Sequence, residues 1–154
     1  MPFQLTSSVF ADGGKIPALY SCQGEDVSPS LVWSGAPASV KSFALFCDDP
    51  DAPRGTFHHW GIFDMPAALD HLGEGHPDEG SPYRQAINDF GNPGYGGPCP
   101  PRGQTHHYRF KLLALDVEKL DVPANARCAD AEIAARKHLL AEATLTGLFA
   151  INAP

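Results

Sequence analysis

The stretch His106-His-Tyr-Arg-Phe-Lys-Leu-Leu-Ala-Leu-Asp116 is the longest strand-like segment of this chain of 154 residues. Successive side chains of a strand point to opposite faces. One face is therefore apolar except for His106 and Tyr108 at its first end, and the other begins with His107. Two polar groups at the mouth of an apolar face are typical of a binding site, whereas His107 is expected to face solvent.

Shorter segments on both sides of this stretch predict further strands. They are residues 3–10, 15–22, 31–34, 42–48, 58–65, 84–89 and 148–152. Segment 42–48 is almost continuously apolar, as expected for a strand that is covered on both faces. By alternation, Asp49 at its end shares a face with Phe43, Leu45 and Cys47.

One helix is predicted near the C-terminal end, from about Ala131 to Thr146. Asp130 is the expected N-cap and Gly147 the expected terminator. Apolar residues recur at helical spacing along one side, which we expect to pack on the body of the domain. The sequence thus predicts a single, mainly β domain over residues 1–154 with one C-terminal helix.

Composition narrows the classes of function. A 43% share of apolar residues is typical of a globular domain, and 15 Pro and 15 Gly spread among apolar stretches indicate an ordered, loop-rich one. A net charge of −7 argues against non-specific nucleic-acid binding, which depends on basic patches. It also argues against electrostatic attachment to an anionic membrane.

The N-terminal segment, the lack of long apolar stretches and the cysteines together indicate a cellular compartment. The segment Met1-Pro-Phe-Gln-Leu-Thr6 has neither a basic region nor an apolar run, so no secretory signal is expected. No stretch approaches the roughly 20 apolar residues of a membrane span. We therefore expect a cytoplasmic protein that does not insert into membranes. In that compartment its cysteines, which are Cys22, Cys47, Cys99 and Cys128, are expected to be reduced packing residues.

Two motifs rich in Asp, Gly and Pro each precede a pair of histidines. Asp48-Asp-Pro-Asp-Ala-Pro53 runs into His58-His59, and Gly94-Tyr-Gly-Gly-Pro-Cys-Pro-Pro-Arg-Gly103 runs into His106-His107. Rigid turns followed by titratable residues at strand starts can form a small, pre-shaped polar pocket. Alternation alone does not decide whether His58 or His59 faces that pocket.

These residues closely resemble the phosphatidylethanolamine-binding protein family, in its bacterial, Raf kinase inhibitor-like branch. The resemblance is carried by Asp49-Pro-Asp-Ala-Pro53, His59-Trp60, Asn88-Asp-Phe-Gly91, Gly94 to Pro101, His106-His-Tyr108 and the segment from His138 to Gly147. It implies a large central β-sheet, a smaller second sheet and a short helical C-terminal region. It also implies a cis peptide bond in the loop from Ala52 to Phe57.

The resemblance further implies a small surface pocket for phosphate-type anions or phosphorylethanolamine-like head groups. Its side chains would be Asp49, Asp51, His59, His106 and Tyr108, with the backbone of Gly96, Gly97 and Pro98 forming one wall. Imidazole N–H groups, a tyrosine hydroxyl and loop amides are suitable donors to phosphate oxygens. An aspartate that points into the pocket would accept from an ammonium group, so a zwitterionic head group would satisfy both signs.

The leading hypothesis is a non-enzymatic binding protein that needs no cofactor. Some members of the family inhibit kinases or serine proteases, which suggests an unidentified kinase or protease as a protein partner. Bacterial relatives are often dimers, so a homodimer is also suggested. No nucleic-acid partner is expected.

The main alternative is a metal-dependent hydrolase that uses Asp49, Asp51, His59 and His106. Two histidines and a carboxylate suit zinc or iron. However, no HExxH or HxH spacing supplies a local chelate. A nucleophilic enzyme based on Cys99, which lies between prolines, is a weaker alternative.

Overall fold

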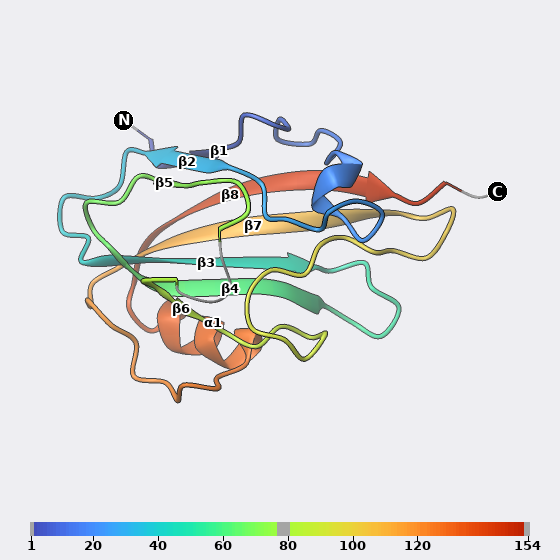
Figure 1. The fold of residues 1–154 in the computed structure, drawn as a ribbon. Coiled ribbons are helices and arrows are strands. Elements are labelled where there is room, and N and C mark those ends of the chain that lie inside the picture. The colour runs from blue at the N-terminus through green and yellow to red at the C-terminus, as the bar shows by residue number, and fades with distance from the viewer. Residues whose placement is uncertain (1, 77–80, 153–154) are drawn as a thin grey trace.

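The computed structural model of the chain describes residues 2–76 and 81–152, and its strands form two sheets (Figure 1). The larger sheet has the order β6-β4-β3-β7-β8, formed by Arg84–Gln85, Phe57–Pro66, Ser42–Asp49, Thr105–Leu115 and Leu139–Ala150. The smaller has the order β1-β2-β5, formed by Gln4–Thr6, Leu31–Ser34 and His71–Leu72. The predicted fold, mainly β with a large and a small sheet and one helix, is confirmed.

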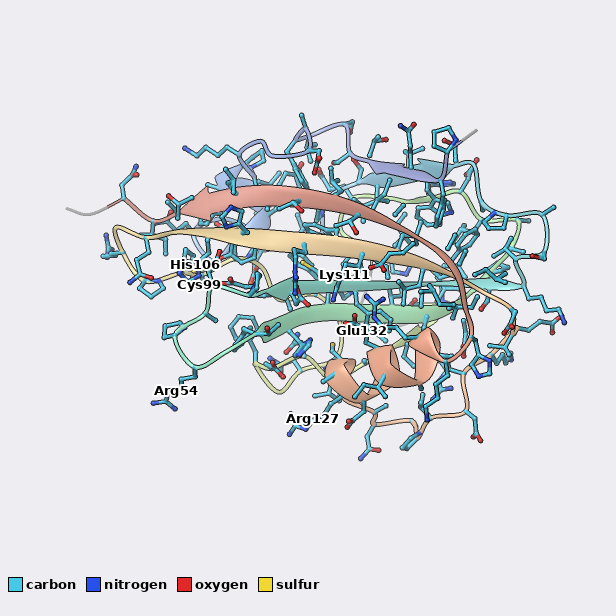
Figure 2. All side chains as sticks on the ribbon, turned by 180° about the vertical axis from the view of Figure 1, so that it is seen from behind. Arg54, Cys99, His106, Lys111, Arg127 and Glu132 are labelled. Atoms are coloured by element: carbon cyan, nitrogen blue, oxygen red, sulfur yellow. A yellow bond between two sulfur atoms is a disulfide. The ribbon has the colours of Figure 1, made fainter. Side chains whose placement is uncertain are left out.

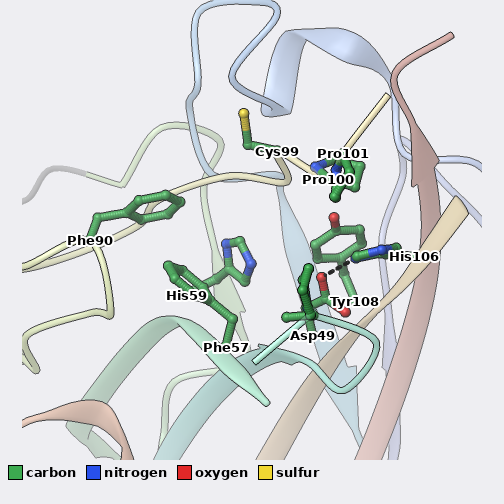
Figure 3. Close-up of a pocket in the computed structure, with 11 residues that line it drawn as sticks. Asp49, Phe57, His59, Phe90, Cys99, Pro100, Pro101, His106 and Tyr108 are labelled. Carbon is green, nitrogen blue, oxygen red and sulfur yellow. Dashed lines mark hydrogen bonds and ion pairs between the residues drawn. The ribbon is translucent and has the colours of Figure 1, made fainter. Parts of the chain in front are cut away.

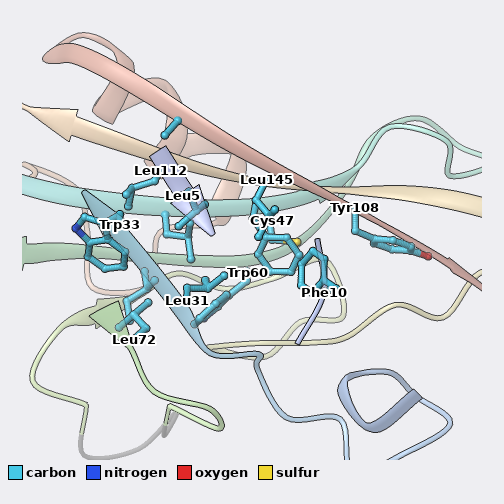
Figure 4. Packing of buried hydrophobic residues seen from close by; sticks show 14 of the residues in the cluster. Leu5, Phe10, Leu31, Trp33, Cys47, Trp60, Leu72, Tyr108, Leu112 and Leu145 are labelled. Carbon is cyan, nitrogen blue, oxygen red and sulfur yellow. The ribbon is translucent and has the colours of Figure 1, made fainter. Parts of the chain in front are cut away.

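The main core fills the space between the two sheets. Trp33 of β2 and Leu72 of β5 face Trp60 of β4 and Leu112 of β7 across this layer (Figure 4). Tyr108 and Phe110 belong to the same core, so the apolar face predicted for the long strand is confirmed. Burial of such large apolar side chains is the main source of stability in a fold of this kind.

The helix α1, Cys128–Arg136, covers the opposite face of the large sheet (Figure 1). Ala131 and Ala135 of α1 pack there against Phe46 and Leu113 in a second, smaller core. Both faces of β3 are therefore covered. This explains why every residue of Ser42–Asp49 is buried, as the almost continuous apolar run predicted.

A buried ion network fastens α1 to the sheet. Lys111 Nζ lies 2.7 Å from Asp48 Oδ2 and 2.8 Å from Glu132 Oε2, so it joins β3, β7 and the helix (Figure 2). Arg109 and Arg136 donate to the same two carboxylates from the solvent side. Burial opposes ionisation of Asp48, but the hydrogen bonds from Arg109 and Lys111 outweigh it and lower the pKa of this carboxyl group.

The helix predicted over residues 131–146 is wrong at its C-terminal end. After Arg136 the chain turns, and Leu139–Ala150 forms β8, which pairs antiparallel with β7 along its length. Long-range pairing has overridden the helical pattern here. Gly147 does not terminate a helix but lies inside β8, where a Cβ atom would overlap the side chain of Ile16.

Smaller boundary errors have local causes. Arg127 occupies the N-cap position of α1, and Asp130 lies in the first turn. The strand predicted over 15–22 is absent, because Pro17 has no N–H for a sheet and a 3-10 helix, Ala18–Tyr20, follows it. The strands predicted over 3–10 and 84–89 are shorter in the structure, and the one predicted over 148–152 is the end of β8.

The cysteine expectation is wrong for one pair. Cys22 and Cys99 are joined by a disulfide across a sequence separation of 77, whereas Cys47 and Cys128 are free and buried. Disulfides are typical of oxidising compartments. The cysteines therefore no longer support a cytoplasmic location, which stays a prediction.

Two further observations concern the backbone and the membrane. No peptide bond among the described residues is cis, so the cis bond expected between Ala52 and Phe57 is not found. Gly55 in that loop has a φ of 105°, an angle that glycine adopts without a steric penalty. In residues 2–76 and 81–152, no helix has the length and apolar character needed to cross a membrane.

Candidate functional site

A cavity of about 120 Å³ opens where the end of β3 meets the starts of β4 and β7 (Figure 3). The antiparallel order brings these three points together, because β3 runs opposite to both of its neighbours. The lining residues are Asp49, Ala52, Pro53, Phe57, His59, Phe90, Cys99, Pro100, Pro101, His106 and Tyr108. Pockets for drug-sized ligands measure about 300–1,000 Å³, so this cavity suits a smaller group.

His106 is held at both ring nitrogens. Its Nδ1 lies 2.6 Å from Asp49 Oδ2, and its Nε2 lies 2.9 Å from Gln104 Oε1. Since a carboxylate only accepts, Nδ1 carries a proton and donates to Asp49, which fixes the orientation of the ring. Both His106 and Asp49 are buried, whereas Gln104 is exposed.

His59 faces the cavity from β4. Its Nδ1 lies 2.7 Å from the carbonyl oxygen of Gly96, so Nδ1 donates and Nε2 is left for a ligand. The ring packs against Phe57 at 4.8 Å and against Tyr108 at 5.3 Å between centroids. Burial lowers the pKa of His59, although its hydrogen bond to Gly96 opposes that shift.

The lowered pKa of His59 predicts a pH-dependent stability. Between its folded pKa and the ordinary value of 6.5, the unfolded chain binds a proton that the folded chain does not. The free energy of unfolding should therefore fall as the pH drops through 6.5 towards the folded pKa. Urea unfolding of wild type and His59→Gln between pH 7.5 and pH 5.5, about one unit either side of the ordinary value, should show a weaker fall in the variant. An equal fall in both proteins would contradict the assignment.

The hydroxyl group of Tyr108 is the least satisfied polar group in the cavity. It is buried and no residue in the described part of the chain meets it at good hydrogen-bond geometry, although the Asp49 carboxylate lies close enough to interact with it. Burial, and then the nearby charge of Asp49, raise the pKa of Tyr108, so the hydroxyl keeps its proton. Buried polar groups are almost always paired in native proteins. A buried donor that lacks a well-formed hydrogen bond beside a cavity therefore points to a ligand.

The structure brings together four of the side chains predicted from the sequence, which are Asp49, His59, His106 and Tyr108. Asp51 does not line the cavity. Its carboxylate accepts from the backbone N–H of His107 at 2.8 Å and lies 2.7 Å from the His107 ring. His107 is exposed, as predicted.

Gly96, Gly97 and Pro98 lie behind the lining residues instead of forming the cavity surface. The Gly96 carbonyl holds His59, and the Pro98 carbonyl accepts from the N–H of Cys22 at 3.1 Å. The amide of Gly97 donates to Asp26 Oδ1 at 2.8 Å and points away from the cavity. Their role here is to position the segment that carries Cys99, Pro100 and Pro101.

Sequence reasoning missed the apolar rim. Phe57 is two residues before His59 in the same strand, so alternation alone places both on one face. Phe90 comes from a loop and meets Phe57 at 4.7 Å between centroids, although no local pattern marks it. Phe90 is 48% exposed, which makes it the most open aromatic group at the cavity.

The geometry does not support the hydrolase hypothesis. In the described part of the chain, the three-residue cluster of potential metal ligands is Asp48, His58 and Glu132, not the residues predicted for a metal. It lies on the α1 side of the sheet, where Lys111 already bonds to both carboxylates. Cys99 is bonded to Cys22, so it offers no thiolate nucleophile.

Comparison with known proteins identifies the family. The family model described as phosphatidylethanolamine-binding protein matches residues 6–150. The chain belongs to this family. The resemblance inferred from the motifs is thereby confirmed.

Relatives within the family cover nearly the whole chain. A UPF0098 protein of Aquifex aeolicus is 46% identical over 149 residues, covering 95% of this chain and 87% of that protein. The UPF0098 protein YbhB of Escherichia coli is 37% identical, covering 95% and 99%. The crystal structure of E. coli YbcL, described as a new member of the mammalian PEBP family, superposes with a TM-score of 0.93 and 36% identity, covering 98% and 99%. None of these names carries an enzymatic activity.

Proposed function

We propose that this member of the phosphatidylethanolamine-binding protein family is a non-enzymatic binding protein for phosphate-type anions or phosphorylethanolamine-like head groups. The observation that carries the proposal is the buried Tyr108 hydroxyl, which lacks a well-formed hydrogen bond and lies beside two oriented histidines. This proposal adds a class of ligand to the family assignment, and it is argued from the polar groups that line the cavity.

The polar groups suit a phosphate. Tyr108 keeps its proton and donates to a phosphate oxygen. His106, whose Nδ1 donates to Asp49, can donate from Nε2 as well only when its ring is protonated, with Asp49 as its counter-ion, once the exposed Gln104 side chain moves aside. His59 accepts at Nε2 from a protonated phosphate oxygen while its Nδ1 stays on Gly96. Because the chain has a net charge of −7, such local donors and not a long-range field must hold the anion.

The remaining groups suit an attached ammonium. Asp49 is a buried carboxylate on the cavity, so it can accept from a cation that follows the phosphate. Phe57 and Phe90 present aromatic faces and edges at the rim, where a cation gains about 0.5–1 kcal/mol at an exposed site. A short zwitterion therefore matches the cavity better than inorganic phosphate alone.

The matched pair His106→Ala and His71→Ala tests the site. Phosphorylethanolamine should bind the metal-free wild type saturably, and His106→Ala should weaken binding by about tenfold or more, the value of one lost charge-assisted hydrogen bond. His71 is exposed on β5, outside the cavity, so His71→Ala should bind like wild type. Histidine ring signals followed by NMR give the affinity. No saturable response in wild type, or equal losses in both variants, would overturn the proposal.

The family resemblance also suggests what such a protein acts on. We propose a regulated protein partner, a kinase or a protease, with a homodimer as the second possible assembly and the cytoplasm as the location. These parts rest on the resemblance and on the sequence pattern. Inhibition assays against kinases and serine proteases, with and without the head group, would test them.

A further inference from the structure

One side of the cavity is a segment that is attached to the body of the protein through a second segment. Residues 94–101, called the pocket wall below, carry Cys99, Pro100 and Pro101 to the cavity (Figure 3). The disulfide from Cys99 reaches Cys22, in the segment 20–26. This bond is the covalent link between the pocket wall and a distant part of the chain.

Hydrogen bonds supplement the disulfide along the same contact. The hydroxyl of Tyr95 donates to the carbonyl of Tyr20 at 2.6 Å, and the amide of Gly97 donates to Asp26 Oδ1 at 2.8 Å. A Cβ atom on Gly97 would overlap the backbone of Tyr20, which shows how closely the two segments approach. Segment 20–26 is therefore the support of the wall on the side of Cys99, whereas His59, Ala86 and Asn88 hold the Gly94–Gly96 end.

The position of the pocket wall also determines how His59 is held. The amide of Gly96 donates to the carbonyl of His59 at 2.9 Å, and the Gly96 carbonyl accepts from the His59 ring at 2.7 Å. A displaced wall would release this ring and open the cavity opposite Tyr108. Glycines such as Gly94, with a φ of 92°, give the segment ample backbone freedom once it is released.

The disulfide is open to reduction. Cys22 and Cys99 are both exposed, whereas the free Cys47 and Cys128 are buried. A thiolate must reach one of the two sulfur atoms to break the bond. Exposed disulfides are the ones that tend to be labile or regulatory.

We propose that the Cys22–Cys99 disulfide is a redox switch that controls ligand binding in the pocket. The inference rests on the proposed function. A dithiol reductant supplies two electrons and two protons: its thiolate attacks one cystine sulfur, the S–S bond breaks, and its second thiol releases the mixed disulfide. The products are two protein thiols and the oxidised, cyclic form of the reductant.

Reduction weakens binding because the ligand can then bind only those molecules in which the pocket wall is in its ordered position. If the reduced wall adopts the closed position about a tenth of the time, the apparent affinity falls about tenfold. The buried residues of β3 and β7 do not depend on the wall, so they should stay ordered.

The experiment compares the affinity of the full, metal-free chain for phosphorylethanolamine before and after treatment with dithiothreitol. Alkylation followed by mass spectrometry verifies that Cys22 and Cys99 have been reduced. The double variant Cys22→Ser, Cys99→Ser is the matched control. It should bind as weakly as the reduced wild type, whether or not dithiothreitol is present. Hydrogen exchange should be faster at the Gly96 and Gly97 amides of the reduced form and unchanged in β3 and β7.

The outcomes separate this inference from the proposed function. Equal affinities of oxidised and reduced protein would overturn the switch and leave the binding function standing. A disulfide that resists dithiothreitol in the folded protein, or a reduction that unfolds β3 and β7 as well, would also overturn it. Failure of the oxidised protein to bind would overturn the proposed function and the switch together.

Discussion

Lys111→Met should lower the free energy of unfolding by about 3–5 kcal/mol, the usual loss when one partner of a buried ion pair is removed. Lys111 is 8% exposed and bonds Asp48 and Glu132 at once. Without it, two carboxylates whose atoms come within 4.8 Å of each other would share a buried space. Arg109 and Arg136 would remain, but they approach from the more exposed side.

Urea unfolding at neutral pH measures this loss. Lys119→Met is a matched control, because Lys119 is exposed and has no ion pair in the described part of the chain. The triple variant Asp48→Asn, Lys111→Met, Glu132→Gln should recover much of the stability, since it buries no charge. A change below about 1 kcal/mol in Lys111→Met, the range of surface ion pairs, would show that the network does not hold α1 on the sheet.

Removing the disulfide should cost about 4 kcal/mol of unfolding free energy. The Cys22–Cys99 bond closes a loop over a sequence separation of 77, so it excludes many conformations of the unfolded chain. The variant Cys22→Ser, Cys99→Ser loses that restriction while most of the folded contacts remain. This global effect is separate from the local loosening of the pocket wall.

Denaturant unfolding of the double serine variant and of oxidised and reduced wild type gives the comparison. Reduced wild type should match the variant, and dithiothreitol should leave the variant unchanged. A loss below about 1 kcal/mol would mean that the unfolded chain already holds these segments close together, so that the bond restricts little.

Strong local patterns predicted much of the fold. The alternation from His106 onward placed Tyr108 and Phe110 on the core face, and the apolar run before Asp49 predicted a doubly covered strand. The motifs around Asp49, His59, His106 and Tyr108 predicted side chains that the structure brings to one cavity. In these segments, local preference and tertiary packing agree.

Where several structures satisfy the same local pattern, the prediction failed. The helix predicted over 131–146 and the strand Leu139–Ala150 compete for the same residues, and pairing with β7 decides between them. Asp51 lies next to the cavity in sequence, but its carboxylate turns to His107. Spacing along the chain cannot show such a choice, because it depends on which partner lies within hydrogen-bond distance.

The sequence by itself determined the family, the mainly β class and the four polar side chains at the cavity, because each is encoded in a motif or an alternation of a few neighbouring residues. Only the tertiary structure decided the Cys22–Cys99 bond, the rim formed by Phe57 and Phe90, and the ion network around Lys111. Each of these joins residues far apart in the chain. Local propensities do not predict such contacts, because these depend on how the folded chain packs.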